Sequence, residues 1–211
     1  MAIFLDENSK VVVQGMTGSE GQKHTRRMIA SGTSIVGGVN PKKAGQEVDF
    51  DGTSVPVFGS VADAIEKTGA DVSVVFVPPA FTKAAVIEAV DAGMPLVVVI
   101  TEGVPVHDTA EFFAYAQSRG TTRVIGPNCL GVMNPQTGLN ATFASAMARP
   151  GRVGFISQSG ALCTAVLDWS FKENVGFSAF VSIGSMLDVG WGDLIDYLGR
   201  DPNTHSIVIY M

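Results

Sequence analysis

Short apolar runs rich in β-branched residues alternate with segments of helical period along the first part of the chain. Such runs are typical of buried strands, and the segments between them carry an apolar face at helical spacing. Strands that alternate with helices favour a parallel sheet with helices on both faces. The pattern predicts strands over residues 11–14, 34–39, 55–58, 72–77, 96–101 and 123–125, and helices over residues 20–30, 61–68, 82–90 and 109–118.

The alternation stops after Gly126 and returns after Gly151. Residues 127–150 carry mixed turn signals, so we expect a linker that is long enough to have a function of its own. The pattern therefore predicts an α/β domain over residues 1–126, a linker over 127–150 and a second α/β domain over 151–211. Within the second domain it predicts strands over 153–156, 179–183 and 207–211, and helices over 161–171 and 193–198.

The last predicted strand, residues 207–211, is followed by no helix. A parallel sheet needs helices on both faces. We therefore expect the second domain to be incomplete and the chain to be a fragment, with apolar side chains of this strand exposed and open to association.

Composition and charge narrow the functional classes. The 211 residues are 46% apolar, enough for a sizeable core, and the net charge of −6 provides no basic field for nucleic acid or an anionic membrane. Two cysteines are too few for a disulfide framework, and the first ten residues lack the apolar run of a signal peptide. The apolar runs are far shorter than the roughly 20 residues of a membrane-spanning helix. We expect a cytoplasmic protein that binds neither nucleic acid nor membrane.

Residues 15–21, GMTGSEG, lie between the first predicted strand and helix. At such a turn, backbone N–H groups and the helix dipole bind phosphate. The glycine spacing is GxxGxxG, whereas a nicotinamide-binding turn reads GxGxxG. The turn therefore indicates a phosphorylated ligand, with a tight connection that binds nothing as the alternative.

The residues after the second predicted strand are Asn40, Pro41, Lys42 and Lys43. An NAD enzyme would carry an acidic residue there to bind the ribose hydroxyls, whereas two cations favour a further phosphate. Ligands with both a pyrophosphate and a ribose phosphate are chiefly coenzyme A (CoA) and NADP. The alternative is a solvated lysine pair on a loop.

Two other strand ends point to the same edge of the sheet. Pro78 follows residues 72–77, and Thr101 and Glu102 stand at the end of residues 96–101. Ligands of open α/β sheets lie at the carboxyl ends of strands. We expect Thr101 and Glu102 to bond the ligand or its adenine amine, whereas Pro78 either contacts the ligand or only ends a strand.

A second strand-to-helix turn, FISQSGA, contains Ser157, Ser159 and Gly160. Hydroxyls and a glycine at a helix start outline a second anion site. Neither serine has the flanking glycines of a GxSxG nucleophile elbow, which excludes that type of hydrolase. The alternative is that Ser157 or Ser159 only caps the helix.

Histidines and cysteines suggest no metal site. His24, His107 and His205 lack metal-ligand spacing, and we expect each at the surface or at a helix end. Cys163 is expected in the core, and Cys129 either lies near a ligand or is a structural thiol.

Several of these motifs occur together in an order that resembles a known family. QGMTGSEG, GGVNPKKAG, VPP, ITEGVP and IGPNC, within residues 1–129, resemble the α subunit of succinyl-CoA ligases. Beyond residue 129, LGVMNPQTGLNATFA, SQSGALCTAVLDW and GDLIDYL are more similar to the acyl-CoA (acetyl-CoA type) synthetases that form a nucleoside diphosphate. The resemblance implies a Rossmann-like CoA-binding domain followed by an incomplete flavodoxin-like ligase domain.

The resemblance also implies roles for particular residues. Ser157, Ser159 and Gly160 correspond to a helix end that stabilises a phosphorylated histidine, and Thr164 takes the position of a tyrosine near the substrate. We group Asn128 with this phosphate and substrate site. The residues expected to contact CoA are Thr17, Gly18, Ser19, Glu20, Lys43, Ile100, Thr101 and Glu102, to which the strand ends add Pro78.

The chemistry implied by the resemblance joins a small carboxylic acid to CoA with ATP or GTP, through a phosphohistidine that lies in a later glycine-rich loop absent from this chain. The magnesium nucleotide would bind a β subunit. We therefore predict a ligase α subunit, or a fragment of one, that acts in the tricarboxylic acid cycle, forms succinyl-CoA or a related acyl-CoA, and is inactive alone. A non-catalytic CoA-binding module is the alternative. An NADP oxidoreductase is disfavoured by the turn spacing and by the lack of a placed proton donor.

Overall fold

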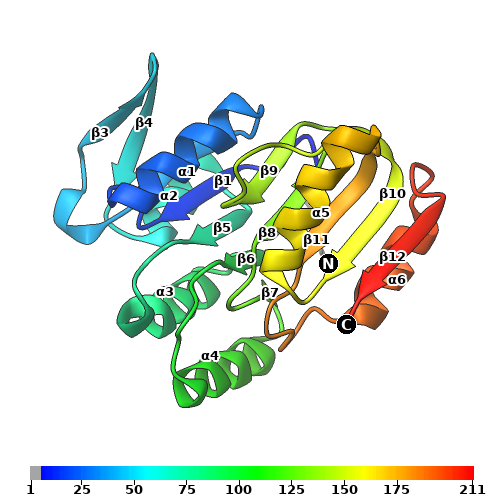
Figure 1. Ribbon diagram of the computed structural model, residues 1–211. Coiled ribbons are helices and arrows are strands. Elements are labelled where there is room, and N and C mark those ends of the chain that lie inside the picture. The colour runs from blue at the N-terminus through cyan, green and yellow to red at the C-terminus, as the bar shows by residue number, and fades with distance from the viewer. Residues whose placement is uncertain (1–5) are drawn as a thin grey trace.

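The computed structural model describes residues 6–211 (Figure 1). The first five residues, which belong to the predicted domain 1–126 and to the segment compared with signal peptides, lie outside the described residues. A first sheet contains β1 (Val11–Gln14), β2 (Ile35–Val39), β3 (Glu47–Phe50), β4 (Thr53–Phe58), β5 (Val72–Val75), β6 (Leu96–Val99) and β7 (Arg123–Ile125). Its order is β3-β4-β2-β1-β5-β6-β7, with every pair parallel except β3 and β4. The predicted parallel sheet is confirmed.

Helices cover both faces of this sheet. They are α1 (Ser19–Ala30), α2 (Val61–Thr68), α3 (Pro79–Asp91) and α4 (Val106–Arg119). Because side chains alternate along a strand, Val12 packs in a cluster with residues of α2, α3 and α4, whereas Val11 and Val13 pack on the opposite face with Met28 of α1. Within residues 6–211, no helix combines the length and apolar character needed to cross a membrane.

The sequence pattern predicts the second strand of the hairpin formed by β3 and β4, but not the first. Residues 55–58 were expected as a strand, but β3 was not, because its polar residues resemble a loop. Asp51 and Gly52, both with positive φ, form the turn of this hairpin. Asp-Gly between two β runs is a strong hairpin signal, and it was the available clue to β3.

A second sheet contains β8 (Gly131–Asn134), β9 (Leu139–Thr142), β10 (Pro150–Ser157), β11 (Phe177–Ser182) and β12 (Ser206–Tyr210). Its order is β12-β10-β11-β8-β9. Strand β10 pairs in parallel with β11 and β12, whereas β8 pairs antiparallel with β11 and β9. The predicted linker over 127–150 thus contains a hairpin that extends this sheet. Helices α5 (Gly160–Glu173) and α6 (Trp191–Arg200) complete the fold.

The two sheets share one hydrophobic cluster, to which β6, β9 and β11 contribute Val98, Ala141 and Val181. Buried hydrogen bonds join them as well. The Thr33 hydroxyl, just after α1, donates to the Asn140 carbonyl at 2.9 Å and accepts from the Asn140 N–H at 2.8 Å. These contacts fix the carboxyl end of α1 against β9.

Strand β12 forms an edge of the second sheet. Ile207 and Ile209 pack against the shared core, whereas Val208 and Tyr210 are each 48% exposed. The expectation of exposed apolar side chains on this strand therefore holds for one of its two faces.

Candidate functional site

Two neighbouring cavities lie where strands of the first sheet end. The turn cavity, about 680 Å³, is bounded by residues 14–21, 39–42, 76–78 and the first turns of α3. The inter-sheet cavity, about 590 Å³, lies between the first sheet and the start of α5. Glu20 and Phe76 line both cavities, so the two cavities adjoin each other.

The glycine turn has the geometry of a phosphate-binding turn. Gly15 has φ of +86°, and its carbonyl accepts a hydrogen bond from the Gly18 N–H at 3.0 Å. A Cβ on Gly21 would lie 2.1 Å from the same carbonyl oxygen. No side chain of residues 6–211 caps the start of α1, so the first amides of this helix are open to an anionic ligand.

The loop after β2 is held onto the turn by Asn40. Its amide nitrogen donates to the Thr17 hydroxyl at 2.7 Å, and its amide oxygen accepts from the Lys42 N–H at 3.0 Å. Lys42 lines the turn cavity. Lys43, the lysine selected from the resemblance, is exposed and lines neither cavity.

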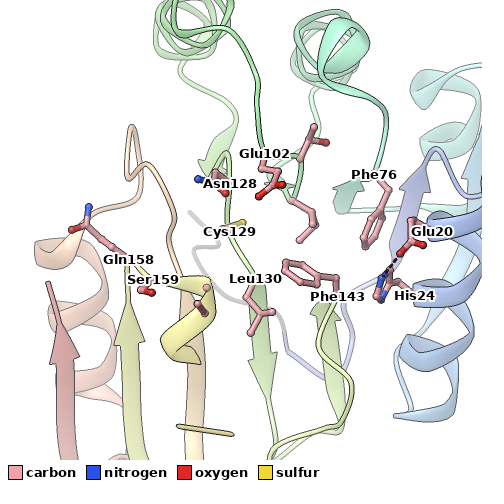
Figure 2. Close-up of a pocket in the computed structure, with 14 residues that line it drawn as sticks. Glu20, His24, Phe76, Glu102, Asn128, Cys129, Leu130, Phe143, Gln158 and Ser159 are labelled. Atoms are coloured by element: carbon pink, nitrogen blue, oxygen red, sulfur yellow. Dashed lines mark hydrogen bonds and ion pairs between the residues drawn. The ribbon is translucent and has the colours of Figure 1, made fainter. Parts of the chain in front are cut away.

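Most of the other predicted site residues come together. Figure 2 shows Glu20, His24 and Phe76 on one side of the inter-sheet cavity and Gln158 and Ser159 on the opposite side. Pro78 and the turn residues Thr17, Gly18, Ser19 and Glu20 line the turn cavity, and Ile100, Thr101, Glu102, Asn128, Ser159 and Gly160 line the inter-sheet cavity. Ser157 is buried, and Thr164 is exposed on α5 away from both cavities.

The start of α5 is capped by the chain itself. The Ser159 hydroxyl accepts from the Leu162 N–H at 3.2 Å, and the Ser157 hydroxyl accepts from the Ser159 N–H at 3.0 Å. The Thr164 hydroxyl donates to the Gly160 carbonyl at 3.2 Å. The hydroxyls therefore shape the helix start, while a phosphate role for Ser157, Ser159 and Gly160 remains a prediction.

His24 is the main residue that the sequence analysis placed wrongly. It is only 5% exposed, not a surface residue, because α1 turns this side chain toward the cavity. Its Nε2 lies 3.2 Å from Glu20 Oε2, and its ring stacks on Phe76 with centroids 5.4 Å apart and meets the Phe143 edge at 5.9 Å. Nδ1 has no partner among the described residues. The four-residue spacing from Glu20 was the available signal.

The free energy of unfolding should decrease when the pH falls below about 6.5, because of His24. Burial is the main cause that lowers its pKa from 6.5, with Arg27 and Lys23 adding to the effect and Glu20 opposing it. As the pH falls through 6.5, the unfolded chain takes up a proton that folded His24 resists. Urea unfolding at about pH 7.5 and about pH 5.5 should show this loss, and His24→Gln should reduce it. The exposed-site variant His107→Gln should keep the wild-type loss, and a His24→Gln variant that also kept it would contradict the assignment.

Both thiols are buried, and Cys129 lines the inter-sheet cavity, as one of the two predictions for it expected. Cys129 is 2% exposed, its Sγ donates to the Val99 carbonyl at 3.1 Å, and burial raises its pKa to about 12. Burial likewise raises the pKa of Cys163 to about 11 in the core, as predicted for its position. Since only a thiolate is a strong nucleophile, neither residue is suited to covalent catalysis at neutral pH.

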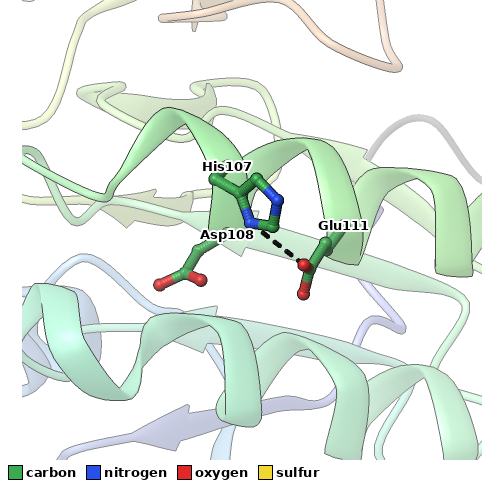
Figure 3. Close-up of side chains that lie close together, drawn as sticks. All are labelled: His107, Asp108 and Glu111. Carbon is green, nitrogen blue, oxygen red and sulfur yellow. Dashed lines mark ion pairs between the residues drawn. The ribbon is translucent and has the colours of Figure 1, made fainter.

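His107, Asp108 and Glu111 lie close together at the start of α4 (Figure 3). His107 Nδ1 is 3.0 Å from Glu111 Oε1, and the Lys83 ammonium of α3 is 3.0 Å from Asp108 and 2.7 Å from Glu111. Hydrogen bonds to Glu111 and then Asp108 raise the pKa of Lys83. Because this ammonium already pairs with both carboxylates, we assign the cluster to ion pairing between α3 and α4.

These features define an α/β protein with a site for phosphorylated ligands. They are a glycine turn at the end of a parallel strand, a lysine loop beside it, and the start of α5 across the inter-sheet cavity. Family models identify the two halves. Residues 6–103 match the CoA binding domain, and residues 150–211 match the succinyl-CoA ligase like flavodoxin domain.

Relatives agree with these matches. The chain is 40% identical over 211 residues to succinate–CoA ligase [ADP-forming] subunit alpha 2 of Archaeoglobus fulgidus, covering 99% of this chain and 72% of that protein. The chain therefore belongs to the family of succinate–CoA ligase α subunits, as the sequence motifs indicated. The predicted α/β fold class, with a CoA-binding part followed by a flavodoxin-like part, is confirmed with it.

Solved structures extend the comparison. The dinucleotide forming acetyl-coenzyme A synthetase 1 of Ca. Korarchaeum cryptofilum matches with a TM-score of 0.84 and 32% identity, over 97% of this chain and 44% of that one. ATP citrate lyase from Methanothrix soehngenii, in complex with citrate and coenzyme A, matches with a TM-score of 0.80 and 25% identity, over 98% of this chain and 36% of that one. The chain thus spans less than half the length of these two proteins.

Proposed function

We propose that the chain binds CoA across both cavities and acts as the α subunit of a ligase that joins CoA to succinate or a related carboxylic acid. The observation that carries this proposal is that the two cavities adjoin and share Glu20 and Phe76 in their linings. One cavity offers open amides for phosphates, and the other leads to a second helix start, where an acyl or phosphoryl group would lie.

Each part of the site has a role in this proposal. The turn from Thr17 to Glu20 binds the pyrophosphate through backbone amides, and Lys42 contacts the ribose phosphate. Ile100, Thr101 and Glu102 contact the pantetheine arm as it enters the inter-sheet cavity. The Thr101 hydroxyl donates to the Val77 carbonyl at 2.8 Å, which leaves its lone pairs free to accept from an amide of that arm.

The reacting groups lie at the other side of the inter-sheet cavity. Asn128 has a left-handed backbone with φ of 57°, and its N–H donates to the Thr101 carbonyl at 2.9 Å. It faces the start of α5 at Ser159 and Gly160, where the helix dipole favours a negative group. The magnesium nucleotide, ATP or GTP, binds a partner β subunit, and the chain alone has little ligase activity.

Calorimetric titration with CoA tests the binding half of this proposal. Charge-assisted bonds contribute about 1.5–3 kcal/mol, so Lys42→Glu should weaken CoA binding by about tenfold or more. Lys43→Glu should change it by about threefold or less, because its ammonium lies outside the cavity. With dephospho-CoA, which lacks the ribose phosphate, the two variants should bind alike. Absence of binding at millimolar CoA would remove the proposal, and a larger effect at Lys43 would reverse the assignment of the two lysines.

Activity separates a ligase subunit from a non-catalytic CoA-binding module. The chain should be combined with a β subunit, a magnesium nucleotide, CoA and a panel of carboxylic acids. A ligase subunit converts one of these acids into a CoA thioester with release of nucleoside diphosphate and phosphate. Tight CoA binding without thioester formation would favour the non-catalytic module.

A further inference from the structure

We infer that Phe81 stacks on the adenine of CoA and makes the site selective for the nucleoside end of that ligand, an inference that rests on the proposed function. Phe81 lies in the first turns of α3, lines the turn cavity and is 63% exposed. Among the large apolar side chains of residues 6–211 that are more than a third exposed, Phe81 is the one that lines the turn cavity.

The lining shared by the two cavities sets the direction that we infer for the ligand. With the phosphates at residues 15–21, the pantetheine arm has to pass Glu20 and Phe76, because these residues form the wall common to both cavities. The thiol then lies in the inter-sheet cavity. The adenosine is left on the far side of the turn, between residues 39–42 and α3, where Phe81 stands.

The walls on that side suit a flat aromatic base. Val77, Pro78, Phe81 and Ala84 give an apolar surface, and the neighbouring Glu88 carboxylate already accepts from the Val61 N–H at 2.8 Å. Stacking of a base on an aromatic ring is favourable for every base. Recognition on this side therefore combines shape and stacking with the acceptor capacity that the Glu88 carboxylate still has.

Two other positions for the adenine are less suitable. Thr101 and Glu102, expected from the sequence to bond the ligand or its adenine amine, line the inter-sheet cavity, into which we place the thiol end. Phe76 is half-buried, and the His24 ring stacks on it at an interplanar angle of 4°. This leaves Phe81 as the exposed aromatic ring of the turn cavity.

Binding of separate parts of CoA tests the inference. Phe81→Ala should weaken binding of CoA and of 3′-phosphoadenosine 5′-phosphate by about tenfold or more, while competition by 4′-phosphopantetheine stays unchanged. Phe81→Tyr should restore wild-type affinity because it keeps the ring. Trp169→Ala is the matched control, since Trp169 is 52% exposed on α5 and lines neither cavity.

Equal loss of affinity for all three ligands, or no loss for CoA, would overturn the role of Phe81. Thermal unfolding shows whether Phe81→Ala lowers the melting temperature of the chain. If it does, the affinity of Phe81→Tyr for CoA alone decides whether the aromatic ring contacts the adenine. If the wild-type chain binds no CoA, the proposed function fails; if it binds CoA and only the selective loss is missing, this inference alone fails.

Discussion

Replacing Gly21 with alanine is expected to weaken CoA binding by about 100-fold or more. The added Cβ would lie 2.1 Å from the Gly15 carbonyl oxygen, 2.8 Å from its carbon and 2.9 Å from Met16 Cα. All three are backbone atoms, so the turn has to move rather than a side chain. Displacing two amides from a phosphate removes two charge-assisted bonds of about 1.5–3 kcal/mol each. Calorimetry with CoA measures the loss, and thermal unfolding should show a lower melting temperature as well.

Gly192→Ala gives the matched control for this prediction. Gly192 lies in α6, has no atom within 4 Å of an added Cβ and is remote from both cavities. The variant should bind CoA as the wild type does and be equally or more stable, because alanine favours helix. Should Gly21→Ala bind CoA as tightly as this control, the turn would not be the phosphate site.

Arg123→Ala is expected to lower the free energy of unfolding by about 3 kcal/mol. Arg123 of β7 reaches both the segment before α6 and the first turn of that helix, with Nε 3.0 Å from Asp188 and Nη2 3.1 Å from Asp193. Its side chain is 16% exposed, and Asp188 also accepts from the Val124 N–H at 2.7 Å. Without the guanidinium, Asp188, whose side chain is 15% exposed, would lose its ion pair between the first sheet and α6. Urea unfolding monitored by circular dichroism measures the change.

An exposed ion pair serves for comparison. Arg200 and Asp196 of α6 pair at 2.8 Å, but their side chains are 79% and 63% exposed. Arg200→Ala should therefore change stability by less than about 1 kcal/mol. Arg123→Lys should fall between the two, since lysine keeps the charge but not the two-pronged geometry. A loss at Arg123→Ala no larger than at Arg200→Ala would show that these contacts contribute little.

Features set by neighbouring residues were predictable from the sequence. The helix over 61–68 was predicted with its observed bounds, and Gly69 ends it in the left-handed conformation that a C-cap requires. The hairpin of β8 and β9 was not predicted, because each strand has four residues. Its burial depends on α1 and on β11, which are distant in the sequence. Such pairing is decided by tertiary contacts rather than by local pattern.

The same distinction applies to the site. Thr17 and Thr101 were selected because they follow strands of the first sheet, and the carboxyl ends of parallel strands meet at one edge. Ser159 was selected because it follows β10 of the second sheet, and the packing of the two sheets places it across the inter-sheet cavity. His24 and Phe81 were not selected, because an imidazole or a phenyl ring on a helix signals a site only when its surroundings are known. Because His24 is buried, its side chain forms part of the lining of the inter-sheet cavity. Because Phe81 is exposed in the turn cavity, its ring is available to a ligand.

Helix α1 carries the open amides at one end and the bonds between Thr33 and Asn140 at the other. A helix of 12 residues behaves as a stiff rod over this length. Fixing its far end therefore restricts tilting of the amide-bearing end. The orientational entropy of those donors is lost during folding, so the incoming ligand meets a receptor that is already ordered.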